Sequence, residues 1–312
     1  MKIREKLTFR GLIISLKELN IAKPADPERF VMEDGLTELL DGLYRYQVQI
    51  VNLDMYQADS KEKLLAVLQL LNLKPEECLL LAATDKVMSL AQELDLACMG
   101  YLNPRILGQR LSQAQMLAQG FEEVDVMFLK RVYQRKHQIP WTLIETRRCI
   151  LREITLEDLD DLYELYQGKA ITKYMEGLYE NRVEEEEYTK AYIQNMYQFY
   201  GYGMWVAVEK ATGKVIARAG LDHMQLPEET VLQLGYVVGE QYQNQGYATE
   251  LCEAILDYAK NHTQFAEIYC FIQKENHISI HLAEKLGFIW KEDIKIRRKS
   301  LQKYVKSLYN VD

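Results

Sequence analysis

Long hydrophobic runs are missing from this sequence. None of its 312 residues lies in a stretch that approaches the ~18 consecutive apolar residues of a membrane-spanning helix. The apolar run at residues 11–14 is too short for the core of a signal peptide, and Lys17 interrupts it. Internal repeats and low-complexity segments are also missing. We therefore expect a cytoplasmic protein.

Cysteine is scarce, and its pattern excludes two classes of protein. The five cysteines are odd in number and lie mostly in apolar runs: Cys78, Cys98, Cys149, Cys252 and Cys270. This usage is typical of reduced thiols in a cytosol and not of a disulfide framework. None has the spacing of metal ligands, so we expect no metal site. The net charge of −8 argues against a nucleic-acid partner.

The most informative stretch covers residues 234–288, with its centre at residues 243–248. Residues 231–238 are apolar except for Gln233 and end at Gly239-Glu240, which predicts a mostly buried strand. Apolar residues then recur at helical spacing from Leu251 to Ala259, so a helix begins at about Gly246. A glycine turn that opens a helix leaves the first backbone N–H groups unpaired. Those donors and the helix dipole suit a phosphate or diphosphate.

This stretch resembles the acetyl-coenzyme A signature of the GNAT superfamily of N-acetyltransferases, Gln/Arg-x-x-Gly-x-Gly/Ala. The signature is present here as Gln243-x-x-Gly246-x-Ala248. A second family element follows at the expected distance: a strand at residues 267–273, then a helix that opens with Asn276-His277-Ile278-Ser279 and closes with Glu284-Lys285-Leu286-Gly287-Phe288. The resemblance covers the chain from about Cys149 to the C-terminus and is greatest to the RimJ/RimL branch.

The resemblance implies an α+β fold with a mixed, mostly antiparallel sheet and acetyl-CoA as cosubstrate. In such enzymes the pantetheine arm inserts beside the splayed central strand like an extra strand. The implied cofactor-binding residues are Val237, Val238, Gln243, Asn244, Gln245, Gly246, Tyr247, Ala248, Thr249, Asn276 and Ser279. A backbone N–H at Val237 or Val238 would also stabilise the thioester oxyanion.

The catalytic residues implied by the resemblance are partly absent. Gln233 stands where many members have a glutamate base, and Ala283 stands where many have a tyrosine acid. Ser279 is kept as a candidate acid. His223, with Asp222 beside it after a predicted strand, is the remaining candidate for a base or for a proton relay through water.

Other patterns in this half predict the elements around the sheet. We expect strands at 149–154, 204–209, 215–221 and around 304–309, a capping box at Thr155-x-x-Asp158, and a hairpin at Thr212-Gly213. A helix is predicted at 183–200, where tyrosines and a methionine recur every four residues. We interpret this stripe as core, and the four glutamates 184–187 as a solvated helix start that could also attract a cationic amine.

In the first half, apolar segments alternate between strand and helix patterns. Strands are predicted at 9–17, 48–52, 78–83 and 97–101, with helices at 34–43 and 61–73 and one that ends at residue 94. This alternation predicts a three-layer α/β unit with a parallel sheet.

That order, with Lys74-Pro75-Glu76-Glu77 before the third strand, resembles the haloacid dehalogenase (HAD) fold over about residues 9–102. The family's catalytic Asp-x-Asp falls on Ser15-x-Lys17, and its Mg²⁺ carboxylate falls near Ala83, with Asp85 close by. A phosphoaspartate cannot form without the first aspartate, and Mg²⁺ prefers carboxylate oxygens. The resemblance therefore implies a degenerate HAD-like domain that acts as a scaffold, partner surface or ligand sensor.

Between the halves, residues 106–135 show two helical patterns, at 110–119 and 124–132. A polar run from Arg131 to His137 before Ile139-Pro140 is typical of a linker. We expect a HAD-like domain with its helical linker at 1–146 and a GNAT domain at 147–312.

Three functions remain open from the sequence. The favoured one is acetyl transfer from acetyl-CoA to a primary amine of a protein N-terminus, peptide or small molecule, by direct transfer in a ternary complex. The second is a regulatory protein that binds acetyl-CoA without transferring its acetyl group. The third is a phosphatase in the first half, which Ser15 and Lys17 disfavour. The first half could also mediate a homo-oligomer or bind a protein partner.

Overall fold

The chain forms two compact units, Met1–Ile139 and Pro140–Asp312, each described here by itself. The structure is a computed structural model that describes residues 8–23, 26–32, 35–103, 106–296 and 299–309. Within these ranges, no helix combines the length and the apolar character needed to cross a bilayer.

The first unit is built on a five-stranded sheet in the order β4-β1-β5-β6-β7. All its neighbouring strands pair in parallel. The strands are β1 (Gly11–Ile14), β4 (Gln49–Asn52), β5 (Cys78–Ala82), β6 (Ala97–Tyr101) and β7 (Met116–Ala118). The parallel sheet predicted from the alternating pattern is confirmed.

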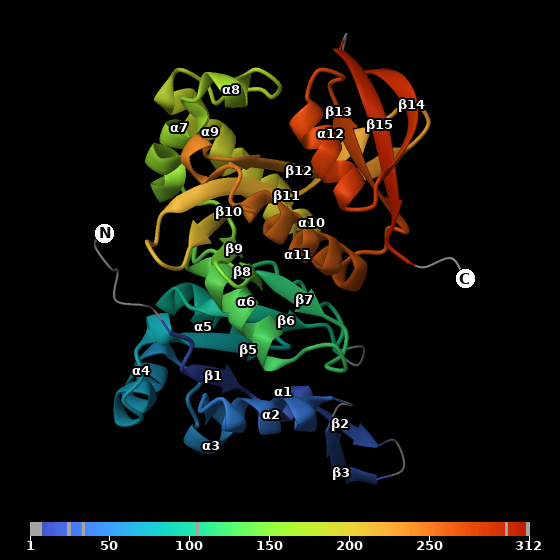
Figure 1. Cartoon of the computed structure of the whole chain (residues 1–312). Coiled ribbons are helices and arrows are strands. Elements are labelled where there is room, and N and C mark those ends of the chain that lie inside the picture. The colour runs from blue at the N-terminus through green and yellow to red at the C-terminus, as the bar shows by residue number, and fades with distance from the viewer. Residues whose placement is uncertain (1–7, 24–25, 33–34, 104–105, 297–298, 310–312) are drawn as a thin grey trace. The chain divides into compact units, whose positions relative to one another are not determined.

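Two cores flank this sheet because successive side chains of a strand point to opposite faces. Leu12 and Ile14 belong to one core and Ile13 to the other. The helices that cover the faces are α2 (Leu36–Arg45), α4 (Lys61–Leu70), α5 (Asp85–Leu94) and α6 (Val126–Lys136); shorter elements are α1 (Leu16–Leu19), α3 (Leu53–Tyr56), η1 (Pro75–Glu77) and the hairpin of β2 (Asn20–Lys23) and β3 (Asp26–Met32). The three-layer arrangement is visible in Figure 1. Asp34, the predicted first residue of α2, lies outside the described residues.

The helix predicted at residues 110–119 is wrong. The segment instead turns into the short strand β7 at the sheet edge. Asp85 accepts hydrogen bonds from the backbone N–H groups of Arg110 (3.1 Å) and Leu111 (2.8 Å), and Leu111 has a positive φ of 44°. These contacts stop a helix from forming, because they take N–H groups out of the helical pattern. The second predicted helix, at 124–132, corresponds to α6.

The second unit contains an eight-stranded sheet in the order β14-β15-β13-β12-β11-β10-β9-β8. Its strands are β8 (Thr142–Glu145), β9 (Cys149–Arg152), β10 (Met204–Glu209), β11 (Val215–Gln225), β12 (Thr230–Val238), β13 (Glu267–Ile272), β14 (Ile289–Ile296) and β15 (Lys299–Ser307). Only β12 and β13 pair in parallel within the described part of this sheet. The predicted mixed, mostly antiparallel sheet is therefore confirmed.

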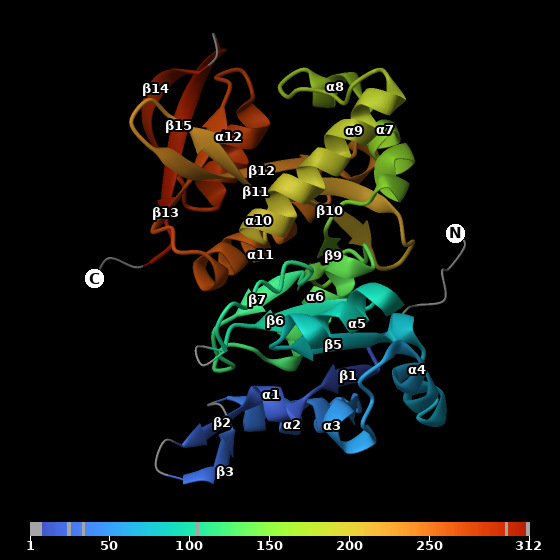
Figure 2. The same ribbon diagram turned by 180° about the vertical axis from the view of Figure 1, so that it is seen from behind.

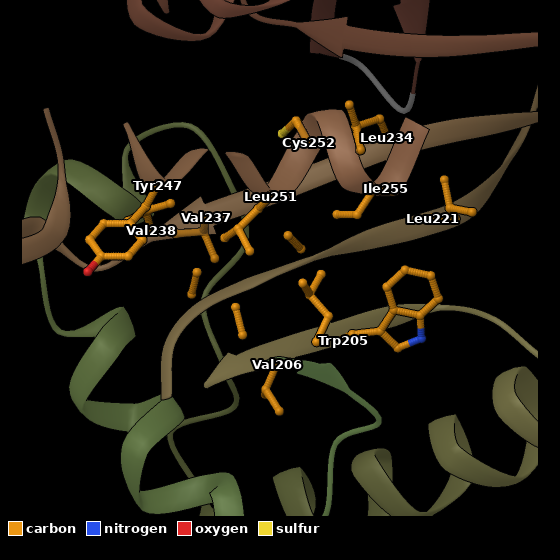
Figure 3. Close-up of a cluster of buried hydrophobic side chains, with 14 of the residues drawn as sticks. Trp205, Val206, Leu221, Leu234, Val237, Val238, Tyr247, Leu251, Cys252 and Ile255 are labelled. Carbon is orange, nitrogen blue, oxygen red and sulfur yellow. The ribbon is translucent and has the colours of Figure 1, made fainter. Parts of the chain in front are cut away.

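Helices cover both faces of this second sheet, as Figures 1 and 2 show from opposite sides. They are η2 (Leu156–Asp158), α7 (Leu159–Tyr166), α8 (Lys169–Thr172), α9 (Arg182–Tyr192), η3 (Ile193–Tyr197), α10 (Gln198–Tyr200), η4 (Glu240–Tyr242), α11 (Tyr247–His262) and α12 (His277–Lys285). Apolar residues of α11 pack on β10, β11 and β12 in the core drawn in Figure 3, where Leu251 lies near Val237 and Ile255 near Leu234. This core fixes the start of α11 relative to the end of β12.

The helix predicted at 183–200 is present as the continuous series α9, η3 and α10, in which η3 is a π-helical turn. Its tyrosine stripe is only partly core. Tyr197 is fully buried, whereas Tyr188 and Tyr200 are exposed. The hydroxyl of Tyr192 accepts a hydrogen bond from the N–H of Met204 at 2.6 Å, and the Tyr197 hydroxyl donates to its carbonyl. Tyr192 and Tyr197 thus link this helix to the start of β10 by hydrogen bonds.

Candidate active site

The turn between β12 and α11 has the geometry of an anion-binding loop. Gly246 is the N-cap of α11 with a φ of +81°, and Asn244 also has a positive φ, of 58°. No side chain caps the first turn of α11. Backbone in alternating left-handed conformations turns successive N–H groups toward one concave side, where they suit an anion. The Gln243 side chain donates to the Val238 carbonyl at 3.0 Å and so ties the loop to the strand end.

An opening lies beside β12, where it diverges from β13. The parallel pair shares a single bridge, Gln233 with Tyr269, although β12 continues to Val238. On its other side, β12 stays paired with β11 along its whole length. The second half of β12 therefore presents its polar backbone groups on one edge without a ladder partner within the described sheet. An extended ligand can add to such an edge as a strand does.

Helix α12 places the second group of predicted cofactor residues next to this opening. Asn276 is its N-cap and accepts a hydrogen bond from the Ser279 N–H at 3.2 Å. Burial raises the pKa of Tyr236 on β12, an effect that the Ser279 side chain opposes. Ala283, which lies one turn after Ser279, is buried. Tyr236 and Ser279 are therefore neighbours on the side of the opening that α12 covers, and the buried Tyr236 hydroxyl has no hydrogen-bond partner among the described residues.

Asp222 and Gln233 face each other across the pair of β11 and β12. Their register is directly opposite, so both side chains lie on the same face of the sheet. This face also carries Arg218, whose guanidinium lies 5.7 Å from the centre of the Tyr192 ring on α9. One Asp222 oxygen accepts a hydrogen bond from the backbone N–H of His223 at 2.8 Å. The Asp222 carboxylate therefore lies next to Gln233, which occupies the position where the resemblance would place a glutamate base.

His223 points away from Asp222. The sequence placed both residues after a strand, but β11 extends to Gln225, and neighbouring residues of a strand face opposite sides. The imidazole Nε2 lies 2.9 Å from the Tyr202 hydroxyl, and its ring packs on Tyr200 and Phe265. Burial lowers the pKa of His223, and Asp222 partly opposes this. The two residues expected to form one catalytic pair are thus separated by the sheet.

One residue that stabilises the Gly246 turn could not be predicted from the sequence pattern. Arg148, just before β9, donates to the Gln245 carbonyl at 2.9 Å and forms an ion pair with Glu250 at 2.6 Å. These partners are about a hundred residues away along the chain, so no local motif signals the contact.

A hollow of about 390 Å³ lies near the end of β12, between η4 and α7. Its acidic residues are Asp161, Glu164 and Glu240, with Lys214 as its basic residue. The last residue of the β12–α11 connection that lines this hollow is Tyr242, and Gly246 does not line it. The hollow is therefore distinct from the concave side of the Gly246 turn.

In the first unit, Ser15 and Lys17 at the family's aspartate positions, and the carboxylates of Asp54 and Asp85, are engaged in hydrogen bonds. Both oxygens of Asp54 lie 3.1 Å from the Ser15 hydroxyl, and one accepts from the Lys17 N–H at 2.9 Å. Asp85 is occupied by two backbone N–H groups of the 110–111 turn. Within the described residues, no group of three or more histidine, cysteine or acidic side chains is arranged to hold a metal ion. These carboxylates stabilise loops at the carboxyl edge of the sheet.

Comparison with known proteins agrees with the geometry of the second unit. The acetyltransferase (GNAT) domain family matches residues 148–289. The uncharacterized protein YkkB of Bacillus subtilis (strain 168) is 30% identical over 170 residues, which cover 54% of this chain and 98% of that protein. Spermidine N(1)-acetyltransferase of Escherichia coli (strain K12) is 24% identical over 139 residues, 44% of this chain and 71% of that protein. A solved acetyltransferase from Agrobacterium tumefaciens str. C58 is 22% identical with a TM-score of 0.44, covering 52% of this chain and 92% of that one.

A helix-opening glycine turn beside an open strand edge suits a coenzyme A-dependent acyltransferase. Through its second unit, the chain belongs to the GNAT acetyltransferase family. It is an N-acetyltransferase, and its cosubstrate is acetyl-CoA.

Proposed function

We propose that the second unit transfers an acetyl group directly from acetyl-CoA to a primary amine in a ternary complex. The observation that carries this proposal is the opening of β12 from β13 after Gln233, which lies beside the Gly246 turn. The first N–H groups of α11 would bind the diphosphate, and the pantetheine arm would extend along the free edge of β12. Asn276 would bind the arm near its amide groups.

The direction of the backbone groups supports Val238 over Val237 as a ligand of the arm. The N–H of Gly239 donates to the Ile216 carbonyl of β11 at 2.9 Å. Because N–H groups alternate sides along a strand, the N–H of Val237 also points to β11, whereas those of Tyr236 and Val238 point to the opening. One of these two would donate to the thioester oxygen as negative charge develops there, an interaction worth ~2.7–4 kcal/mol.

Asp222 is the base that the geometry supports best. The amine must lose a proton as its nitrogen bonds to the acetyl carbon, and Asp222 on the α9 face would receive that proton directly or through a water molecule. Gln233 opposite it has an amide, which is not a useful proton acceptor. His223 lies on the other face, so we no longer propose it as the base.

The leaving sulfur would be protonated on the α12 side of the opening. When the bond between carbon and sulfur breaks, the electron pair stays on sulfur, and the Ser279 hydroxyl would pass a proton to the sulfur while it takes one from solvent water. Tyr236 lies beside Ser279 and would assist it. The amine would thus reach the acetyl carbon from one face of the sheet, and the leaving sulfur would be protonated on the other.

The acceptor is a primary amine of a protein N-terminus, a peptide or a small molecule. An α-amine with a pKa near ~8 is partly neutral at physiological pH, whereas a lysine amine at ~10.4 depends more on a base. The similarity to a spermidine N-acetyltransferase and to the RimJ/RimL branch makes a polyamine and a protein N-terminus the first candidates to test.

The experiment is thiol release from acetyl-CoA in the presence of an amine panel containing spermidine, α-amino peptides and lysine peptides. We expect one class to release free coenzyme A in equal amount to the acetylated product. Tight binding of acetyl-CoA with no release for any amine would instead favour a regulatory protein that senses acetyl-CoA.

For the first unit, we propose a HAD-like domain without phosphatase activity that acts as a scaffold, ligand sensor or surface for a partner or second copy. Support comes from Ser15 and Lys17 at the family's aspartate positions and from the engagement of Asp54 by both. A phosphate-ester assay with Mg²⁺ should give no turnover. We also propose that the protein acts in the cytoplasm.

A further inference from the structure

The guanidinium of Arg148 holds three parts of the cofactor turn at once. Its Nε donates to Glu250 at 2.6 Å, its Nη1 donates to the Gln245 carbonyl at 2.9 Å, and its Cζ lies 3.8 Å from the centre of the Tyr247 ring. The backbone N–H of Arg148 also donates to Glu250 at 2.8 Å. The planar fork of arginine allows all these contacts together, whereas a lysine could make only part of them.

The contact with Gln245 sets the direction of a binding group. The C=O and N–H of one trans peptide point in opposite directions. Because Arg148 holds the Gln245 carbonyl, the N–H of Gly246 in the same peptide is turned away from Arg148. It points toward the side opposite Arg148, where an anion would meet a donor instead of a repelling carbonyl oxygen.

The contacts with Glu250 and Tyr247 fix the first turn of α11. The Glu250 N–H closes that turn on the Gly246 carbonyl at 3.1 Å, and the Tyr247 hydroxyl donates to Glu209 at the end of β10. The Arg148 and Glu250 side chains are 28% and 17% exposed, so the pair is partly shielded from competing water. The N–H groups of the turn are therefore oriented before any ligand arrives.

We infer that Arg148 is a positioning residue for acetyl-CoA: from its place just before β9, it pre-forms the diphosphate turn without itself reacting. The inference rests on the transfer proposed above. Its partner Glu250 balances its charge, so the role is one of geometry and not of net attraction for the diphosphate.

Steady-state kinetics with two acetyl donors tests this role. In Arg148→Gln we expect the KM for acetyl-CoA to rise about tenfold, which is the effect of one or two lost hydrogen bonds, with kcat within about threefold of wild type. S-acetylpantetheine lacks the diphosphate, so its kcat/KM should be unchanged. Arg148→Lys should recover less than half of the loss, because it keeps the charge but not the fork.

Glu250→Ala separates geometry from charge. It removes a negative charge beside the diphosphate. If the role of Arg148 were purely electrostatic, this change would lower the KM for acetyl-CoA. If Glu250 instead helps Arg148 to position the turn, losing their ion pair should raise the KM for acetyl-CoA severalfold. Arg182→Gln is the matched control, because Arg182 also bridges two carboxylates, Asp160 and Glu186, but lies on the exposed start of α9. It should leave both donors unaffected.

Hydrogen exchange of the backbone N–H groups at 244–249, measured without cofactor, should be faster in Arg148→Gln than in wild type. An unchanged KM, an equal loss with both donors, full recovery by lysine, or unchanged exchange would each overturn the inference. Coenzyme A binding by calorimetry keeps the test independent of turnover. If wild type binds coenzyme A but acetylates no amine, the proposed function fails while the Arg148 comparison can still be made.

Discussion

Gln233 and Asp222 are a directly opposed pair on the face of the second sheet that α9 covers. In the sequence, Gln233 is the residue that weakens the resemblance to an active transferase, because an amide replaces a carboxylate. The strand register places the Asp222 carboxylate across from it on the neighbouring strand. The chemistry of the missing glutamate can therefore come from β11.

Asp222→Asn is expected to lower kcat about 10²-fold with little change in the KM for acetyl-CoA, because it removes a proton acceptor and leaves the cofactor turn intact. The variant keeps an oxygen that can accept the hydrogen bond from the His223 N–H. His223→Gln, altered on the opposite face, should retain most of the activity. Equal losses in both variants, measured by thiol release, would contradict the assignment of the base.

His223 should instead influence stability as a function of pH. Burial lowers its pKa in the folded protein, so the unfolded chain binds the proton more readily. Its contribution to stability is therefore present above ~6.5, the ordinary histidine pKa, and is lost as the pH falls through the folded value. Urea unfolding at pH 8 and pH 5.5 should show a smaller loss on acidification for His223→Gln than for wild type. An identical loss would mean that His223 does not contribute.

At the scale of elements, the turn that opens α11 could be predicted because its signals are local. A glycine, an apolar strand before it and helical spacing after it all lie within a short stretch of the sequence. The opposite orientations of Asp222 and His223 were missed because the strand was ended at Leu221 instead of Gln225. Arg148 was missed for another reason: it meets Gln245 and Glu250 only through the tertiary fold.

Strands β10 and β11 approach each other closely at Gly220. A Cβ placed there would lie 2.1 Å from the carbonyl oxygen of Gly203, which is backbone and cannot move aside like a side chain. Gly220→Ala should therefore destabilise the second unit by about 3 kcal/mol in urea unfolding. Gly177→Ala is the control, since its Cβ would meet only an ordinary contact at 3.6 Å. Similar small effects for both would show that the strands can separate there.

At the scale of the molecule, each unit has hydrophobic cores of its own. The core of the second unit runs from Cys149 to Leu308, and the two cores of the first contain residues up to Tyr133. A unit with its own core can fold alone. The strand β8 belongs to the second sheet, so the folding unit begins at Pro140 within the segment expected to be linker.

We therefore expect a fragment of residues 140–312 to unfold cooperatively and to bind acetyl-CoA with a Kd within about threefold of the full chain. Calorimetry and thermal unfolding measure both properties. A fragment that is unfolded, or that has lost acetyl-CoA binding, would show that the first unit contributes to the cofactor site.

The most direct measurement is calorimetric titration of acetyl-CoA into wild type, Gly246→Asp and Gly246→Asn. Aspartate and asparagine both tolerate a backbone with a φ of +81° better than other side chains, so the two variants differ chiefly in the negative charge that aspartate adds at the turn. We predict binding by wild type, a loss of at least about a hundredfold in Gly246→Asp, and a loss of less than about tenfold in Gly246→Asn. No binding by wild type, or equal binding by all three proteins, would contradict the diphosphate turn as the basis of cofactor recognition.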